Sequence, residues 1–194
     1  MKSTVSHVFM QADVNQSRRS FVMSSASVAV CAVGIPGCQH ASNDRQLTFP
    51  SLAVAEEELA RLVQAKELTS STTLSWAQTL MHCAQSIEYS MSGYPQGKSK
   101  FFQRTAGAAA FEAFSWRGRM THDLAEPIPG APVLETELAP ARALERLHAA
   151  VLAFRQWTEV LQPHFAYGEL SKKEYELAHA MHLANHLSAF QAKS

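Results

Sequence analysis

Apolar side chains recur every three or four positions along most of the chain after residue 50, a spacing typical of amphipathic helices. Almost no stretch shows the strict alternation of a half-buried strand. Five stretches share the helical spacing, at about 52–68, 70–92, 99–117, 140–161 and 171–191. The pattern therefore predicts a chain built almost entirely from helices.

Local signals support the expected helix ends. Gly93 follows the second stretch and Gly118 follows the third, and glycine is favoured just beyond a helix C-terminus. Ser171 begins the last stretch with Glu174 three residues on, which is the capping-box spacing. These residues make the second, third and fifth helices the best defined.

A proline-rich connection separates the third stretch from the fourth. THDLAEPIPGAPVLE, residues 121–135, is followed by Pro140, and proline at this density blocks helix formation and leaves an extended crossover. Several amphipathic helices with one long crossover predict an all-α fold, a four-helix bundle with an extra helix over residues 51–194. A polar tether, residues 41–50, is expected to precede the bundle.

Residues 1–40 have the features of an export signal. Arg18 and Arg19 precede an uncharged run, residues 20–38, which is too weakly apolar for a membrane-spanning helix. SRRSFV resembles the twin-arginine (Tat) signal, which implies the Tat translocase as a partner and a periplasmic or cell-envelope location. A chance arginine pair before an apolar run is the alternative.

The cysteines give a second expectation about maturation. IPGC, ending at Cys38, resembles a lipobox, so Cys38 is a candidate for acylation and a weak membrane anchor. The alternative is simple cleavage near Ala41. In either case Cys83 is the only thiol left for the fold, which excludes an intramolecular disulfide, and its expected role is that of a small buried side chain.

Composition excludes some functions. The chain has 17 Lys and Arg against 17 Asp and Glu, for a formal net charge of +0, so no basic surface for nucleic acid is expected. We find no serine-centred triad motif, no phosphate-cradling glycine loop and no CxxC pair. The oligomeric state stays open, with a homodimer among the alternatives.

Histidines carry the candidate chemistry. His182 and His186 are four positions apart on the last helix, so both can bind one ion from the same face. Tyr175 and His179 share this arc of the helix, and the role of His179 stays open. A third ligand must come from elsewhere, and His82 on the second helix is the best candidate.

The position of His82 is ambiguous from periodicity. It lies nearly opposite the apolar stripe of its helix, which favours exposure to solvent or to a polar cavity lined by Gln78, Ser86 and Tyr89. His164 is expected to serve a turn before the last helix, with a place in the same pocket as the alternative, and His122 and His148 are expected at the surface. Glu88 and Tyr89 are the candidate general bases.

Three segments together carry a family resemblance: HCAQSIEYSMSGYP, FFQRTAG with AFEAFSWRGRMTHDLAEPIPGAP, and PHFAYGELSKKEYELAHAMHLANHL. They resemble the uncharacterised domain-of-unknown-function family 1569, within the DinB-like (YfiT-like) superfamily. The resemblance implies a four-helix bundle that binds a divalent ion through three histidines, at positions matching His82, His182 and His186. Asn185 departs from the superfamily pattern, which often has a histidine there.

The resemblance also suggests a chemistry. Three neutral imidazoles would hold a divalent transition metal such as Zn²⁺ or Ni²⁺ with an open position. That position could activate water or a thiol, as in a metal-dependent hydrolase or the thiol S-transferases of the superfamily. The alternatives are a non-catalytic envelope binding or scaffold protein, and a histidine pH switch.

Overall fold

The computed structural model describes residues 44–193 of the chain. The expected export signal, with Arg18, Arg19 and Cys38, lies outside the described residues. Within the described part, no helix has both the length and the apolar character needed to cross a membrane.

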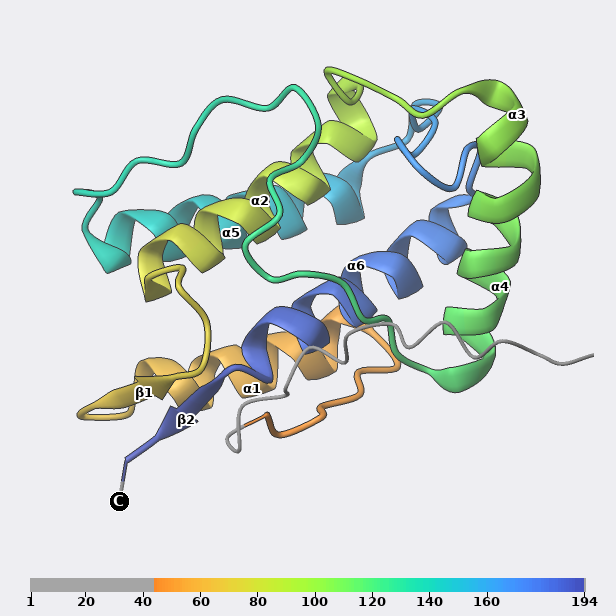
Figure 1. Cartoon of the computed structure of the whole chain (residues 1–194). Coiled ribbons are helices and arrows are strands. Elements are labelled where there is room, and N and C mark those ends of the chain that lie inside the picture. The colour runs from red at the N-terminus through yellow and green to blue at the C-terminus, as the bar shows by residue number, and fades with distance from the viewer. Residues whose placement is uncertain (1–43, 194) are drawn as a thin grey trace, which may run out of the picture. The chain divides into compact units, whose positions relative to one another are not determined.

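Helices dominate the described chain (Figure 1). The four long ones are α1 (Leu52–Val63), α2 (Trp76–Ser92), α5 (Pro140–Gln156) and α6 (Lys172–Leu187). A shorter helical arm consists of α3 (Lys100–Phe102), the π-helical turn η1 (Gln103–Gly107) and α4 (Ala108–Arg117). The expected all-α fold class is confirmed, and the narrower DinB-like bundle stays a prediction.

The long helices share one apolar core. Burying their amphipathic faces against each other stabilises helices that would be marginal alone. The core includes Leu52 and Leu59 of α1, Leu80 and Ile87 of α2, Leu147 and Phe154 of α5, and Leu183 and Leu187 of α6. The predicted inward stripe of α2 is buried from Ala77 to Met91, which confirms the helical spacing there.

Helix ends differ from the expected ones. The first helix ends at Val63, and the chain then forms β1 (Leu68–Ser70), which pairs antiparallel with β2 (Phe190–Ala192). The last helix therefore ends at Leu187 and not near residue 191. The fourth helix ends at Gln156, before the predicted residue 161. The two strands escape local prediction because each is three residues long.

Two non-helical segments, the crossover and the described part of the tether, pack against the helices. The crossover between α4 and α5 is extended, as its prolines predict, and Figure 1 shows it passing across α6 and α2. At the other end, Arg45 N and Leu47 N donate to the carbonyl oxygen and to Oγ of Ser188, at 3.1 and 2.8 Å. The described part of the expected tether is thus hydrogen-bonded to the end of α6.

Candidate metal centre

Two helices with well-defined starts carry the candidate ligands. A capping box of Ser75 and Gln78 begins α2, which carries His82. The predicted capping box of Ser171 and Glu174 begins α6, which carries His182 and His186. These caps fix where each helix begins and therefore which face each histidine occupies.

The three histidines converge on one point. One ligand atom from each of His82, His182 and His186 lies within 4.8 Å of the others. Nε2 of His182 and Nε2 of His186 are 3.1 Å apart, and the ring of His82 has its centroid 5.1 and 4.6 Å from theirs. Nitrogens that share one ion at about 2.0–2.1 Å lie about 2.9–3.4 Å apart for ligand angles between octahedral and tetrahedral.

Burial keeps these rings neutral. His82 is 3% exposed and His186 is 1% exposed, so the interpretation of His82 as solvent-exposed is wrong. Burial, with a smaller contribution from His122, lowers the pKa of His82 to about 4. The pKa values of His182 and His186 also lie well below the usual histidine range, because burial opposes the charged form. Neutral imidazole is the form that binds a metal.

The contact between His182 and His186 is compatible with a shared cation. Two neutral rings can share one N–H···N bond between the facing Nε2 atoms of His182 and His186. That bond places a single proton between two nitrogens, whereas a dication would accept the lone pairs of both Nε2 atoms. Within residues 44–193, Nδ1 of His186, which does not face His182, is buried without a hydrogen-bond partner. The side chains of His82, His182 and His186 are therefore suited to bind a metal ion.

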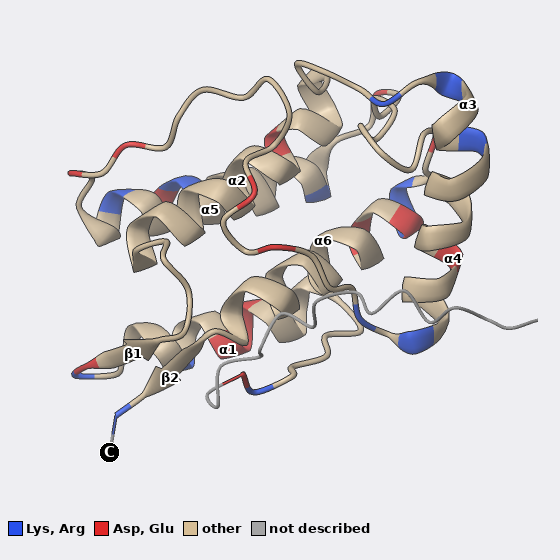
Figure 2. Ribbon diagram, in the orientation of Figure 1, with Lys and Arg blue, Asp and Glu red and all other residues tan. Residues whose placement is uncertain are grey.

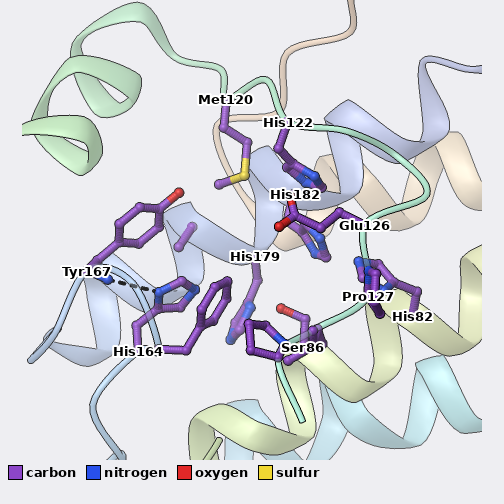
Figure 3. Close-up of a pocket in the computed structure, with 14 residues that line it drawn as sticks. His82, Ser86, Met120, His122, Glu126, Pro127, His164, Tyr167, His179 and His182 are labelled. Carbon is purple, nitrogen blue, oxygen red and sulfur yellow. Dashed lines mark hydrogen bonds between the residues drawn. The ribbon is translucent and has the colours of Figure 1, made fainter. Parts of the chain in front are cut away.

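A cavity of about 120 Å³ opens beside the cluster. Figure 3 shows the residues around it, which come from α2, the crossover, the turn before α6, and α6 itself. Its polar lining includes His82, Ser86, His122, Glu126, His164, Tyr167, His179 and His182. A small molecule could thus reach a bound ion while contacting side chains from four parts of the chain.

His122 corrects the sequence interpretation, which placed it at the surface. Its ring lies over that of His182, with centroids 5.2 Å apart, and it lines the cavity. Nδ1 of His122 is 2.9 Å from the carbonyl oxygen of Asp123, so Nδ1 must donate. Residues 121–135 have no helical periodicity, so no local pattern shows that His122 turns inward.

The other two cavity histidines are deeply buried. Nδ1 of His164 accepts hydrogen bonds from the backbone N–H groups of Ala166 and Tyr167, both at 3.2 Å, which confirms its expected turn role. His164 also lines the cavity. Nε2 of His179 lies 3.2 Å from Oγ of Ser90, and burial lowers the pKa of both histidines to about 3.

The remaining candidates lie outside the cavity. Glu88 forms a two-point ion pair with Arg146, at 2.8 and 2.7 Å, so its proposed role as a general base is not supported. Tyr89 does not line the cavity either. His148 is exposed and Cys83 is fully buried, as expected.

Comparison with known proteins gives the family. No curated protein and no solved structure matches the chain. A family model does match, and it covers residues 41–193, which include every helix described above. The chain therefore belongs to the family described as "Protein of unknown function (DUF1569)".

Proposed function

We propose that this protein binds one divalent first-row transition-metal ion through His82, His182 and His186. The observation that carries the proposal is the approach of three neutral imidazoles from two helices to within 4.8 Å. The absence of a carboxylate or thiolate from the group favours ions that accept nitrogen ligands, such as Zn²⁺ or Ni²⁺. This arrangement agrees with membership of the DinB-like superfamily, which the family resemblance implies.

The site suits catalysis on a small ligand. A bound ion would act as a Lewis acid and lower the pKa of a coordinated water or thiol. Three protein ligands would leave at least one coordination position for water or a ligand, and the cavity adjoins His82 and His182. Around it His122 and Glu126 offer polar groups, and the buried His164 and half-buried Tyr167 form a wall. A metal-dependent hydrolase and a thiol S-transferase are both compatible with these features.

We further propose that the protein is exported in folded form. SRRSFV has the twin-arginine pattern, and residues 20–38 are uncharged. If the metal ion binds before export, the ions available in the cytoplasm determine which one occupies the site. If it bound after export, relative affinity alone would favour copper. Replacing Arg18 and Arg19 with lysine should then leave the protein in the cytoplasm. The mass of the mature N-terminus distinguishes acylated Cys38 from cleavage near Ala41.

Metal analysis tests the proposed site. The full chain, expressed with its own signal and purified without chelators, should contain about one equivalent of metal per three-histidine site. His182→Ala should lose it, whereas His148→Ala, which changes an exposed histidine on α5, should retain it. A wild-type protein that is purified without metal and does not bind added Zn²⁺, Ni²⁺ or Co²⁺ would overturn the proposal and favour the non-catalytic scaffold.

A further inference from the structure

We propose that the cavity beside the histidines selects ligands that carry an amine or another hydrogen-bond-donating cation, and that Glu126 and His122 receive this group. The proposal rests on the proposed metal site, which would hold the other end of the ligand. It adds a class of ligand, which neither the family nor the three-histidine cluster specifies.

The charge of the lining carries the first part of the argument. A second cavity, of about 270 Å³, adjoins the first and shares His82, Glu126, Pro127 and Ile128 with it. Within residues 44–193, Glu126 is the only Asp, Glu, Lys or Arg among the residues that line the two cavities. An anionic substituent would thus meet a carboxylate and no arginine or lysine, whereas a cationic one would find a partner.

Hydrogen-bonding capacity points the same way. Nδ1 of His122 donates to the carbonyl oxygen of Asp123, so the neutral ring offers only its Nε2 lone pair to a ligand. The carboxylate of Glu126 accepts as well, and Figure 3 shows it turned toward His122. Two neighbouring acceptors are satisfied by a donor such as ammonium or guanidinium.

Charge on the wider crossover reinforces this preference. Between Arg119 and Arg142 the chain has four acids and no lysine or arginine. The acids are Asp123, Glu126, Glu135 and Glu137, and Figure 2 shows acidic positions both where the crossover passes α6 and α2 and at its far end, before α5. A run of one sign raises the local concentration of oppositely charged ligands.

The backbone around Glu126 is held in place. Ile128 is 5% exposed and its carbonyl oxygen accepts from the N–H of Ala131 at 2.9 Å. The N–H of Glu126 donates to the carbonyl oxygen of Asp123 at 3.2 Å, and the following Pro127 restricts the Glu126 backbone. A fixed backbone lowers the entropy cost of pairing at Glu126, whose side chain is itself exposed.

Matched probes test the charge preference. Thiolates are good ligands for first-row ions, and thiolate binding to Co²⁺ produces a near-ultraviolet charge-transfer band. The Co²⁺-loaded full-length protein is titrated at pH 7 with cysteamine, 2-mercaptoethanol and thioglycolate, which share a thiol and differ in charge. The variants are wild type, Glu126→Gln and Glu137→Gln. Glu137 is an exposed acid of the same crossover that lines neither cavity.

The Kd of thioglycolate divided by the Kd of cysteamine depends on Glu126 and also on which thiol the metal ion itself binds more tightly. The contribution of the metal ion is the same in wild type and in Glu126→Gln, so the difference between their ratios reports Glu126 alone. We expect this ratio to fall about three- to fivefold in Glu126→Gln, the size of an exposed ion pair, and to stay unchanged in Glu137→Gln. 2-Mercaptoethanol should bind both variants as it binds wild type.

An unchanged ratio in Glu126→Gln would overturn the inference, as would an equal weakening of all three probes or the absence of any thiol binding. A protein that takes up no Co²⁺ would instead overturn the metal site itself. The two failures are therefore distinguishable before any thiol is added.

Discussion

The ring of His122 stacks on the ring of His182, with centroids 5.2 Å apart and planes inclined by 24°. Its centroid is also 5.1 Å from that of His186. His122 nevertheless lies outside the group of three whose ligand atoms approach within 4.8 Å. It therefore covers the candidate metal centre from the crossover without completing it.

We predict that His122→Ala keeps about one equivalent of metal, because the three proposed ligands remain. Its affinity should fall by less than the roughly 10–100-fold that follows loss of a hydrogen-bonded partner of a ligand. His82→Ala should lose far more of the metal affinity, because it removes a proposed ligand. Competition with a chromophoric chelator measures the affinity of both variants. Equal losses in the two variants would show that His122 is a fourth ligand.

The sequence predicts the His182–His186 pair because residues four apart on a helix share a face whatever surrounds them. His82 is different. Its polar side of α2 also carries Gln85, Ser86 and Ser90, and all four are buried, because α6 and the crossover cover that side. A hydrophobic stripe identifies only the apolar face, so the family resemblance, and not periodicity, points to His82.

Long-range contacts explain the other differences. The β1–β2 pairing aligns Leu68 with Ala192, and no local pattern links segments so far apart in the chain. The π-helical turn within the predicted 99–117 helix depends likewise on a remote partner. There Nε2 of Gln103 donates to the carbonyl oxygens of His164 and Phe165, at 3.3 and 3.2 Å. Propensity identifies the helices, whereas packing sets their ends and interruptions.

Gly107 at the end of this π-turn should not tolerate a side chain. A Cβ there would lie 2.0 Å from the carbonyl oxygen of Ala166, on the turn that carries His164. We predict that Gly107→Ala lowers the free energy of unfolding by about 1–3 kcal/mol, the cost of overpacking. Gly97→Ala is the matched control, since its Cβ would lie at ordinary contact distances, 3.4 Å from Gln103 and 3.8 Å from the carbonyl oxygen of Phe165. Urea unfolding measures both, and equal midpoints would contradict the prediction.

Arg45 should stabilise the end of α6. Its Nη2 donates to the carbonyl oxygen of Leu187 at 2.9 Å, and its Nη1 lies 2.6 Å from Oε1 of Glu58. Both side chains of this pair are mostly buried. Arg45→Ala should therefore cost about 1–3 kcal/mol in thermal unfolding, because charged hydrogen bonds are lost and Glu58 loses a partner. Arg142→Ala, which removes an exposed ion pair on α5, should change the stability by less than about 1 kcal/mol.

Stability of the chelator-treated protein should fall as the pH falls below 6.5. Burial lowers the pKa of His179 to about 3, whereas the same residue in the unfolded chain has a pKa of about 6.5. Between these values the unfolded state binds the extra proton, so the free energy of unfolding decreases by up to about 1.4 kcal/mol per pH unit for each such histidine. His164, whose pKa is also about 3, adds to the same slope, and both contributions fade by about pH 7.5, where the histidines of the unfolded chain are mostly deprotonated.

His179→Gln should make this decline shallower, because an uncharged amide replaces a group that the unfolded state protonates. The mutation also disturbs the contact with Ser90, so stability at pH 7.5 is expected to drop in the variant even though its pH dependence weakens. Urea midpoints at pH 7.5, 6.0 and 5.0 separate the two effects. His148→Gln is the control, since this histidine is exposed on α5 and lies outside the buried cluster, and the variant should keep the wild-type slope. An identical slope for His179→Gln and wild type would mean that His179 is protonated in the folded protein as readily as in the unfolded chain, against its burial among Ser90, Phe154 and Tyr175.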